Sequence, residues 1–166
     1  GPFWVATMDN QLHRRIGGFY RVDPHGSVHP QFRDVFVANT VALSPEEDTI
    51  YFSDTRRHVT WRFALDVASG NLGDRQVFVD YAPSRDRPDG ACVDSEGFVW
   101  NAIFAGGRVI RYAPDGRVDR VLTVPVSNPT CVCLGGPELR TLYITTARRF
   151  LTQRQLRDEP WAGSLL

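Results

Sequence analysis

The chain repeats a pattern of short apolar segments at a nearly constant interval. The clearest pair is GGFYRVDPHG at residues 17–26 and GGRVIRYAPDG at residues 106–116. A second apolar unit, centred on an aromatic side chain, occurs four times, with that aromatic residue at Trp4, Tyr51, Trp100 and Tyr143. These positions are 47, 49 and 43 residues apart. A repeat of about 40–50 residues made of short strands is typical of a β-propeller, so we predict an all-β propeller.

The length of the chain predicts only part of such a propeller. Its 166 residues hold about three and a half units, whereas six blades at this period need roughly 270–280 residues. We therefore expect residues 1–166 to form a single partial propeller domain, a fragment that lacks N-terminal blades and final strands. The alternative is an open wedge whose exposed sheet edges would favour association.

Individual strands can be assigned most clearly in the third unit. Glycine-containing turns separate four strand-like segments there, at residues 90–95, 98–104, 108–114 and 117–124. The pattern breaks at RRFLTQRQLRDEPWAG, residues 148–163, which is polar and predicts a helical insertion. We interpret this insertion as a surface excursion; the other interpretation is a lid over one end of the propeller.

Charge and composition exclude several classes of function. The 19 basic residues, all of them Arg, balance 19 acidic residues, so nothing predicts a nucleic-acid or membrane partner. Without Lys, the chain holds no Schiff-base or P-loop lysine. We expect a cytoplasmic protein.

The three cysteines do not predict a disulfide framework. They are sparse and odd in number, at Cys92, Cys131 and Cys133, and no second Cys or His pair stands at metal-ligand spacing. We expect small buried hydrophobic side chains, with Cys131 and Cys133 on one face of a strand.

Polar residues precede the strands that would line the propeller channel. If Leu43, Val93 and Cys133 are equivalent, Asn39 and Asp89 occupy the same place in neighbouring blades. Amide and carboxylate oxygens suit Ca²⁺, Mg²⁺, Mn²⁺ or an oxygen-rich Zn²⁺ site, so the alignment predicts one divalent cation. The alternative is local: Asn and Asp-Gly are common in turns for backbone reasons.

Five segments together resemble one known family. They are FWVATMD at residue 3, VANTVALSPEEDTIYFSDT at residue 37, RPDGACVDSEGFVW at residue 87, GGRVIRYAPDG at residue 106 and SNPTCVCLGGPELRTLYITTAR at residue 127. In this order and spacing they resemble the SMP-30/gluconolactonase/regucalcin-like six-bladed propellers. The resemblance covers nearly the whole chain and implies a metal-dependent lactonase or related esterase.

The resemblance also implies roles for individual residues. Asn39 would be the amide ligand of the cation, and Asp89 would be its carboxylate ligand and the catalytic group that orients or deprotonates water. The N-terminal Glu ligand of the family has no counterpart in this chain. The family's substrate-contacting Arg and Asn, which lie upstream of the FWVAT strand, have no counterpart in this chain either. The family often carries an acidic residue just after that strand, and we take Asp9 and Gln11, which stand there, as the candidate substrate-binding residues.

The chain departs from the family pattern at two positions. Thr40 follows Asn39 where the family prefers Gly, and a β-branched residue accepts the backbone conformations open to Gly poorly. Asn101 stands where the family has Val or Ala, and we interpret it as solvent-facing, with a new channel contact as the alternative.

The leading hypothesis is therefore hydrolysis of a sugar lactone, with the cation as Lewis acid and Asp89 activating water. No G-x-S-x-G motif is present, and His13, His25, His29 and His58 fall in turns and strand ends, where we expect surface positions. One alternative is a non-catalytic binding or regulatory propeller; another is an inactive fragment, and we expect little activity from the isolated chain. The Pro88-Asp89-Gly90 motif argues against a strictosidine-synthase-like enzyme.

Overall fold

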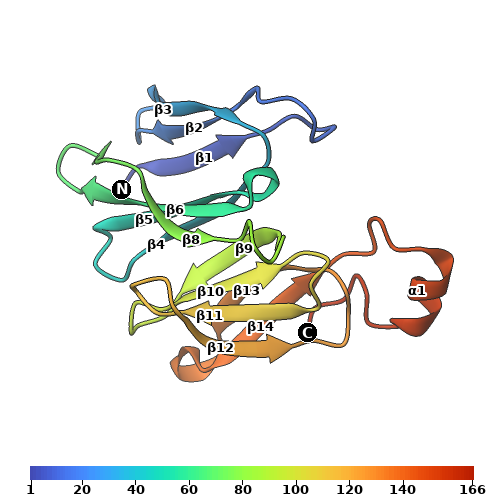
Figure 1. Ribbon diagram of the computed structural model, residues 1–166. Helices are drawn as coiled ribbons and strands as arrows, with labels where there is room; N and C mark the ends of the chain where they lie inside the picture. The colour runs from blue at the N-terminus through green and yellow to red at the C-terminus, as the bar shows by residue number, and fades with distance from the viewer.

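The computed structural model describes residues 1–166 and contains four antiparallel sheets that follow one another along the chain (Figure 1). The first sheet comprises β1 (Phe3–Thr7), β2 (Gly17–Val22) and β3 (Val28–Val35). The second comprises β4 (Ala38–Leu43), β5 (Thr49–Asp54), β6 (Val59–Asp66), β7 (Asn71–Leu72) and β8 (Gln76–Asp80). The third comprises β9 (Pro88–Val93), β10 (Val99–Ile103), β11 (Arg108–Tyr112) and β12 (Val118–Thr123). The fourth comprises β13 (Pro129–Gly135) and β14 (Thr141–Thr146), extended by a bridge between Thr145 and Leu165.

These sheets confirm the predicted all-β propeller, present as consecutive blades. The aligned aromatic residues also have equivalent partners in the paired strands. Trp4 pairs with Arg21 between β1 and β2, Tyr51 with Arg62 between β5 and β6, and Trp100 with Arg111 between β10 and β11. The same aromatic–arginine pair thus recurs in three blades.

Each pair of neighbouring sheets encloses its own hydrophobic core. The first core lies between the first and second sheets and includes Phe19 and Phe52, both fully buried. The second packs Tyr51 and Phe78 against Ile103, and the third packs Val109 against Val132 and Ile144. Because an interior sheet is covered on both faces, its strands are apolar at consecutive positions and not only at alternate ones.

The inner strands β4, β9 and β13 lie side by side near the centre of the molecule (Figure 1). Each carries one extra residue relative to the strand beside it, a β-bulge, at the same place in all three. On β4 the bulge falls between Asn39 and Ala42, on β9 between Pro88 and Ala91, and on β13 between Pro129 and Cys131. A bulge turns side chains out of the regular alternation, so it re-aims the residues at this end of each strand.

Helical structure is limited to short turns. They are η1 (Thr55–Arg57), η2 (Pro137–Leu139) and α1 (Gln153–Asp158). The predicted helical insertion is α1, which a capping box between Thr152 and Gln155 begins and which projects away from the sheets (Figure 1). None of these helices has the length and apolar character needed to cross a bilayer.

The expectation of buried cysteines is wrong for two of the three. Cys131 and Cys133 do share one face of β13, but both are exposed, whereas Val132 between them is buried. Cys92 is partly buried.

Candidate functional site

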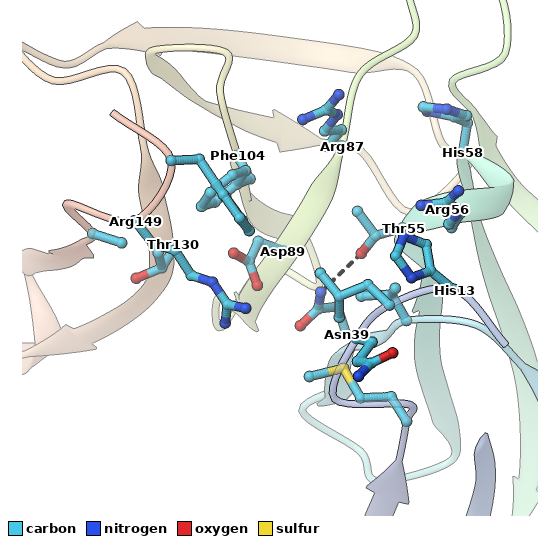
Figure 2. A pocket seen from close by; sticks show the side chains of 16 residues that line it. His13, Asn39, Thr55, Arg56, His58, Arg87, Asp89, Phe104, Thr130 and Arg149 are labelled. Atoms are coloured by element: carbon cyan, nitrogen blue, oxygen red, sulfur yellow. Dashed lines mark hydrogen bonds between the residues drawn. The ribbon is translucent and has the colours of Figure 1, made fainter. Parts of the chain in front are cut away.

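A cavity of about 660 Å³ opens at one end of the blades, where the inner strands begin. Four blades contribute to its wall, mostly through the connections that follow β1, β5, β10 and β14 (Figure 2). The lining residues are Met8, Gln11, Leu12, His13, Val37, Asn39, Thr55, Arg56, His58, Arg87, Asp89, Phe104, Thr130, Ala147, Arg149 and Phe150. The structure therefore brings Asn39, Asp89 and Gln11, three of the predicted site residues, into one cavity.

The amide of Asn39 is oriented by a relay between two blades. Its Nδ2 donates to Oγ1 of Thr55 at 2.8 Å, and the Thr55 hydroxyl donates to the carbonyl oxygen of Pro88 at 2.6 Å (Figure 2). Because a carbonyl can only accept, the Thr55 proton points to Pro88, and its oxygen must accept from Asn39. The relay therefore fixes which end of the amide is nitrogen and leaves Oδ1 of Asn39 available to a ligand.

Asp89 is a carboxyl group in a poorly solvated place. Its side chain makes no hydrogen bond to another side chain, and no arginine comes within ion-pair distance of it. Burial raises the pKa of Asp89 to about 7, opposed only by a hydrogen bond from the backbone of Gly90. Such a group can accept a proton near neutral pH, and its charged form gains from a nearby cation.

The shifted pKa of Asp89 predicts how stability responds to pH when no cation is bound. The folded-state pKa, about 7, lies above the ordinary value of 3.8. Between these values the folded state holds a proton that the unfolded state has released, so the free energy of unfolding falls as pH rises through this window. Denaturant unfolding in chelator should show this decline in the wild type and a weaker one in Asp89→Asn. Parallel profiles for the two proteins would contradict the assignment.

Thr40 has the left-handed backbone that its place in the sequence predicts, with φ of 50°. This conformation costs a non-glycine residue about 1–3 kcal/mol. The Thr40 hydroxyl donates to the main-chain oxygen of Asp89 at 2.5 Å and accepts from Nδ2 of Asn101 at 3.0 Å. Each hydrogen bond contributes about 0.5–1.5 kcal/mol, so the two together largely offset the backbone cost.

Asn101 is buried between two blades, and the expectation that it faces solvent is wrong. It is 1% exposed, and its Nδ2 also lies 3.1–3.2 Å from the main-chain oxygens of Asp89 and Gly90. Its Oδ1 accepts from the hydroxyl of Tyr81 at 3.2 Å. The two departures from the family pattern, Thr40 and Asn101, therefore contact each other and hold the backbone on which Asp89 sits.

The two candidate substrate-binding residues have different surroundings. Gln11 lines the cavity, but Asp9 does not. The carboxylate of Asp9 is 5% exposed and accepts from the backbone nitrogens of Arg14, His13 and Gln11 at 3.0, 3.2 and 3.4 Å. These hydrogen bonds, that from Arg14 first, keep the pKa of Asp9 below its usual value. Asp9 thus shapes the loop that presents Gln11.

Several cavity residues were not predicted from the sequence. Arg56 and His58 follow β5, Arg149 follows β14, and His13 lies in the connection after β1. Arg87 immediately precedes β9. The repeat itself contains the information that would find most of them, because they occupy the same connection in successive blades.

The chemistry of the donors fits a hard divalent cation. Oδ1 of Asn39 is left free by its own hydrogen bond, and the Asp89 carboxylate is desolvated and unpaired. Nowhere in the chain do three His, Cys, Asp or Glu side chains gather at metal-binding distance. Asn39 and Asp89 would thus supply two oxygen ligands of a larger shell.

Comparison with known proteins covers nearly the whole chain. Residues 1–148 match the family model described as the SMP-30/Gluconolactonase/LRE-like region. The 6-deoxy-6-sulfogluconolactonase of Pseudomonas putida is 42% identical over 164 residues, which are 98% of this chain and 56% of that protein. The crystal structure of regucalcin from Agrobacterium tumefaciens, a calcium-binding protein, superposes with a TM-score of 0.94 at 32% identity, covering 99% of this chain and 56% of that one.

A gluconolactonase from Xanthomonas campestris is more distant in structure. Its TM-score is 0.73 at 26% identity, over 87% of this chain and 50% of that one. The chain thus spans about half the length of the relatives that it matches.

Proposed function

Because the chain belongs to the SMP-30/gluconolactonase/LRE-like family, we propose that the protein hydrolyses a sugar lactone with the help of one divalent cation. The observation that carries this proposal is the meeting of Asn39 and Asp89 in one cavity, each with an oxygen that the fold leaves free. The lactonases among its relatives support the reaction, and the calcium-binding relative supports the cation.

Asn39 and Asp89 would hold the cation, which could be Ca²⁺, Zn²⁺, Mg²⁺ or Mn²⁺. When bound, it polarises the carbonyl oxygen of the lactone and stabilises the oxyanion that develops there. The relay through Thr55 would keep Oδ1 of Asn39 aimed at the site without rearrangement.

Asp89 would also act as the base. It takes a proton from water, whose oxygen then forms a bond to the carbonyl carbon of the lactone. As the ring C–O bond breaks, the proton returns from Asp89 to the departing oxygen, which leaves a hydroxy acid. Gln11, which lines the cavity, would hydrogen-bond a sugar hydroxyl, and the apolar side chains of Phe104 and Phe150 would limit the water around the reacting atoms.

Removal of the cation tests this proposal. In the full-length protein, we expect a chelator to abolish hydrolysis of gluconolactone, and readdition of one of the four cations to restore it. Calorimetry should show that Asn39→Ala binds the cation at least about tenfold more weakly than the wild type, because the variant loses a ligand. The matched control is Asn71→Ala, which alters an exposed Asn on β7 outside the cavity.

Two results would contradict the proposal in different ways. Hydrolysis that persists in chelator would remove the cation from the mechanism. Cation binding without hydrolysis of any aldonolactone would identify a binding or regulatory propeller instead of an enzyme.

A further inference from the structure

We propose that the substrate carries an anionic group, a sulfonate, phosphate or carboxylate, which Arg56, Arg87 and Arg149 hold in the cavity. This inference rests on the proposed lactone hydrolysis and specifies the class of lactone. It follows from the balance of charge among the cavity residues of this chain, from the lack of carboxylate partners for these arginines, and from their positions around one cavity.

The part of the cavity wall that this chain forms is more basic than the chain as a whole. The chain has equal numbers of basic and acidic residues, whereas the cavity is lined by three arginines and one carboxyl group, Asp89. A bound divalent cation would add further positive charge. A neutral lactone leaves this excess uncompensated, whereas an anionic lactone offsets it.

None of the three arginines forms an ion pair with a carboxylate of the chain. Elsewhere such pairs are common, as for Arg57 with Asp34 at 2.7 Å and Arg108 with Asp86 at 2.6 Å. Arg56, Arg87 and Arg149 are exposed to the cavity, and their guanidinium groups are available to a ligand.

The three arginines come from three different blades. Arg56 lies in η1 after β5, where the buried carboxylate of Asp54 accepts from its backbone nitrogen at 3.2 Å. Arg87 leads into β9, and Arg149 follows β14 with its guanidinium 4.8 Å from the ring centre of Phe150. Figure 2 shows Arg149 on one side of Asp89, and Arg56 and Arg87 on the other sides.

The chemistry of arginine specifies the partner further. Its planar guanidinium makes paired hydrogen bonds to two oxygens of one anion, which matches carboxylate, phosphate and sulfonate groups. A cavity of about 660 Å³ has room for a sugar ring together with such a group. The lactone carbonyl would then lie at Asn39 and Asp89, and the anionic end would reach one of the arginines that lie around them.

Binding of ring sugars that cannot be hydrolysed tests the charge preference separately from the reaction. Glucose, glucose 6-phosphate and glucose with a 6-sulfonate can be titrated into the full-length protein by calorimetry, with the divalent cation present. We expect at least one anionic sugar to bind about tenfold or more tightly than glucose, and less so at high salt. The phosphate and sulfonate arms distinguish the two anions.

Arginine variants show whether these residues carry the preference. In Arg56→Gln/Arg87→Gln/Arg149→Gln, the ratio of anionic to neutral affinity should fall about tenfold or more, with single variants showing which arginine contributes most. Arg120→Gln is the matched control, because Arg120 is exposed on β12 away from the cavity and should leave the ratio unchanged.

Two outcomes would overturn the inference. One is that neither anionic sugar binds more tightly than glucose; the other is a preference that survives in the triple variant and therefore belongs to the cation. The corresponding lactones test hydrolysis on their own. Anion-selective binding without turnover would contradict the proposed function alone, and turnover without anion selectivity would contradict only this inference.

Discussion

Replacing Asp89 with Asn should lower kcat/KM for lactone hydrolysis by about a hundredfold to ten-thousandfold in the full-length protein. Asn keeps the shape of the side chain but can neither carry the negative charge that a cation prefers nor accept a proton from water. The loss should appear with every lactone that the protein accepts, because Asp89 acts at the carbonyl common to all of them.

The same substitution should leave the fold intact. Asp89 makes no side-chain hydrogen bond to another side chain, and burial disfavours its charged form. In chelator above pH 7, Asp89→Asn should therefore be at least as stable to denaturant as the wild type. Asp86→Asn is the matched control, since Asp86 precedes the same strand but pairs with Arg108 outside the cavity. Activity of Asp89→Asn within threefold of that control would remove Asp89 from the mechanism.

Replacing Gly90 with Ala should destabilise the protein by about 3 kcal/mol. The inner strands β9 and β13 approach each other so closely here that a Cβ on residue 90 would meet Sγ of Cys131. It would also lie 2.6 Å from Cβ and 2.9 Å from Cα of Cys131. Because Cα is backbone, rotation of a side chain cannot relieve the clash, and the two blades must separate.

A second substitution tests this cause. Cys131→Gly removes Sγ and Cβ, so the double variant should recover at least about 1 kcal/mol of the loss in a double-mutant cycle by denaturant unfolding. Gly73→Ala is the control, because its new Cβ would come no closer than 3.4 Å to any neighbour. Equal stabilities for Gly90→Ala and Gly73→Ala would show that the blades are not in tight contact at Gly90.

The sequence repeat predicted the features that equivalent positions share in successive blades. The equivalence of Trp4, Tyr51 and Trp100 is repeated in their Arg partners, and the alignment of Asn39 with Asp89 corresponds to their meeting in one cavity. The strained backbone of Thr40 also followed from its sequence position. The roles of Asn39 and Asp89 stay predictions until they are measured.

The features that the sequence did not predict depend on what covers a strand. Asn101 alternates with Val99 and Ile103 and so shares their buried face, but its polarity suggested solvent. Cys131 and Cys133 are apolar enough for a core, yet both are exposed on β13. Arg56 follows β5 and Arg149 follows β14, which the repeat aligns, but only the structure shows that both residues line one cavity.

The bulge that recurs in the inner strands has a consequence for how such proteins diversify. The extra residue lies near the start of each inner strand, beside a different side chain in each blade. The residue beside the bulge is Asn39 on β4, Asp89 on β9 and Pro129 on β13, so it carries an amide, a carboxylate and no polar side chain, respectively. One substitution in one blade therefore changes the chemistry of the shared cavity and leaves the hydrogen-bonded ladders of the sheets in place. We therefore expect single substitutions at these positions to change which substrate or cation the cavity accepts, because the backbone bulge directs the side chain and the side chain supplies the chemistry.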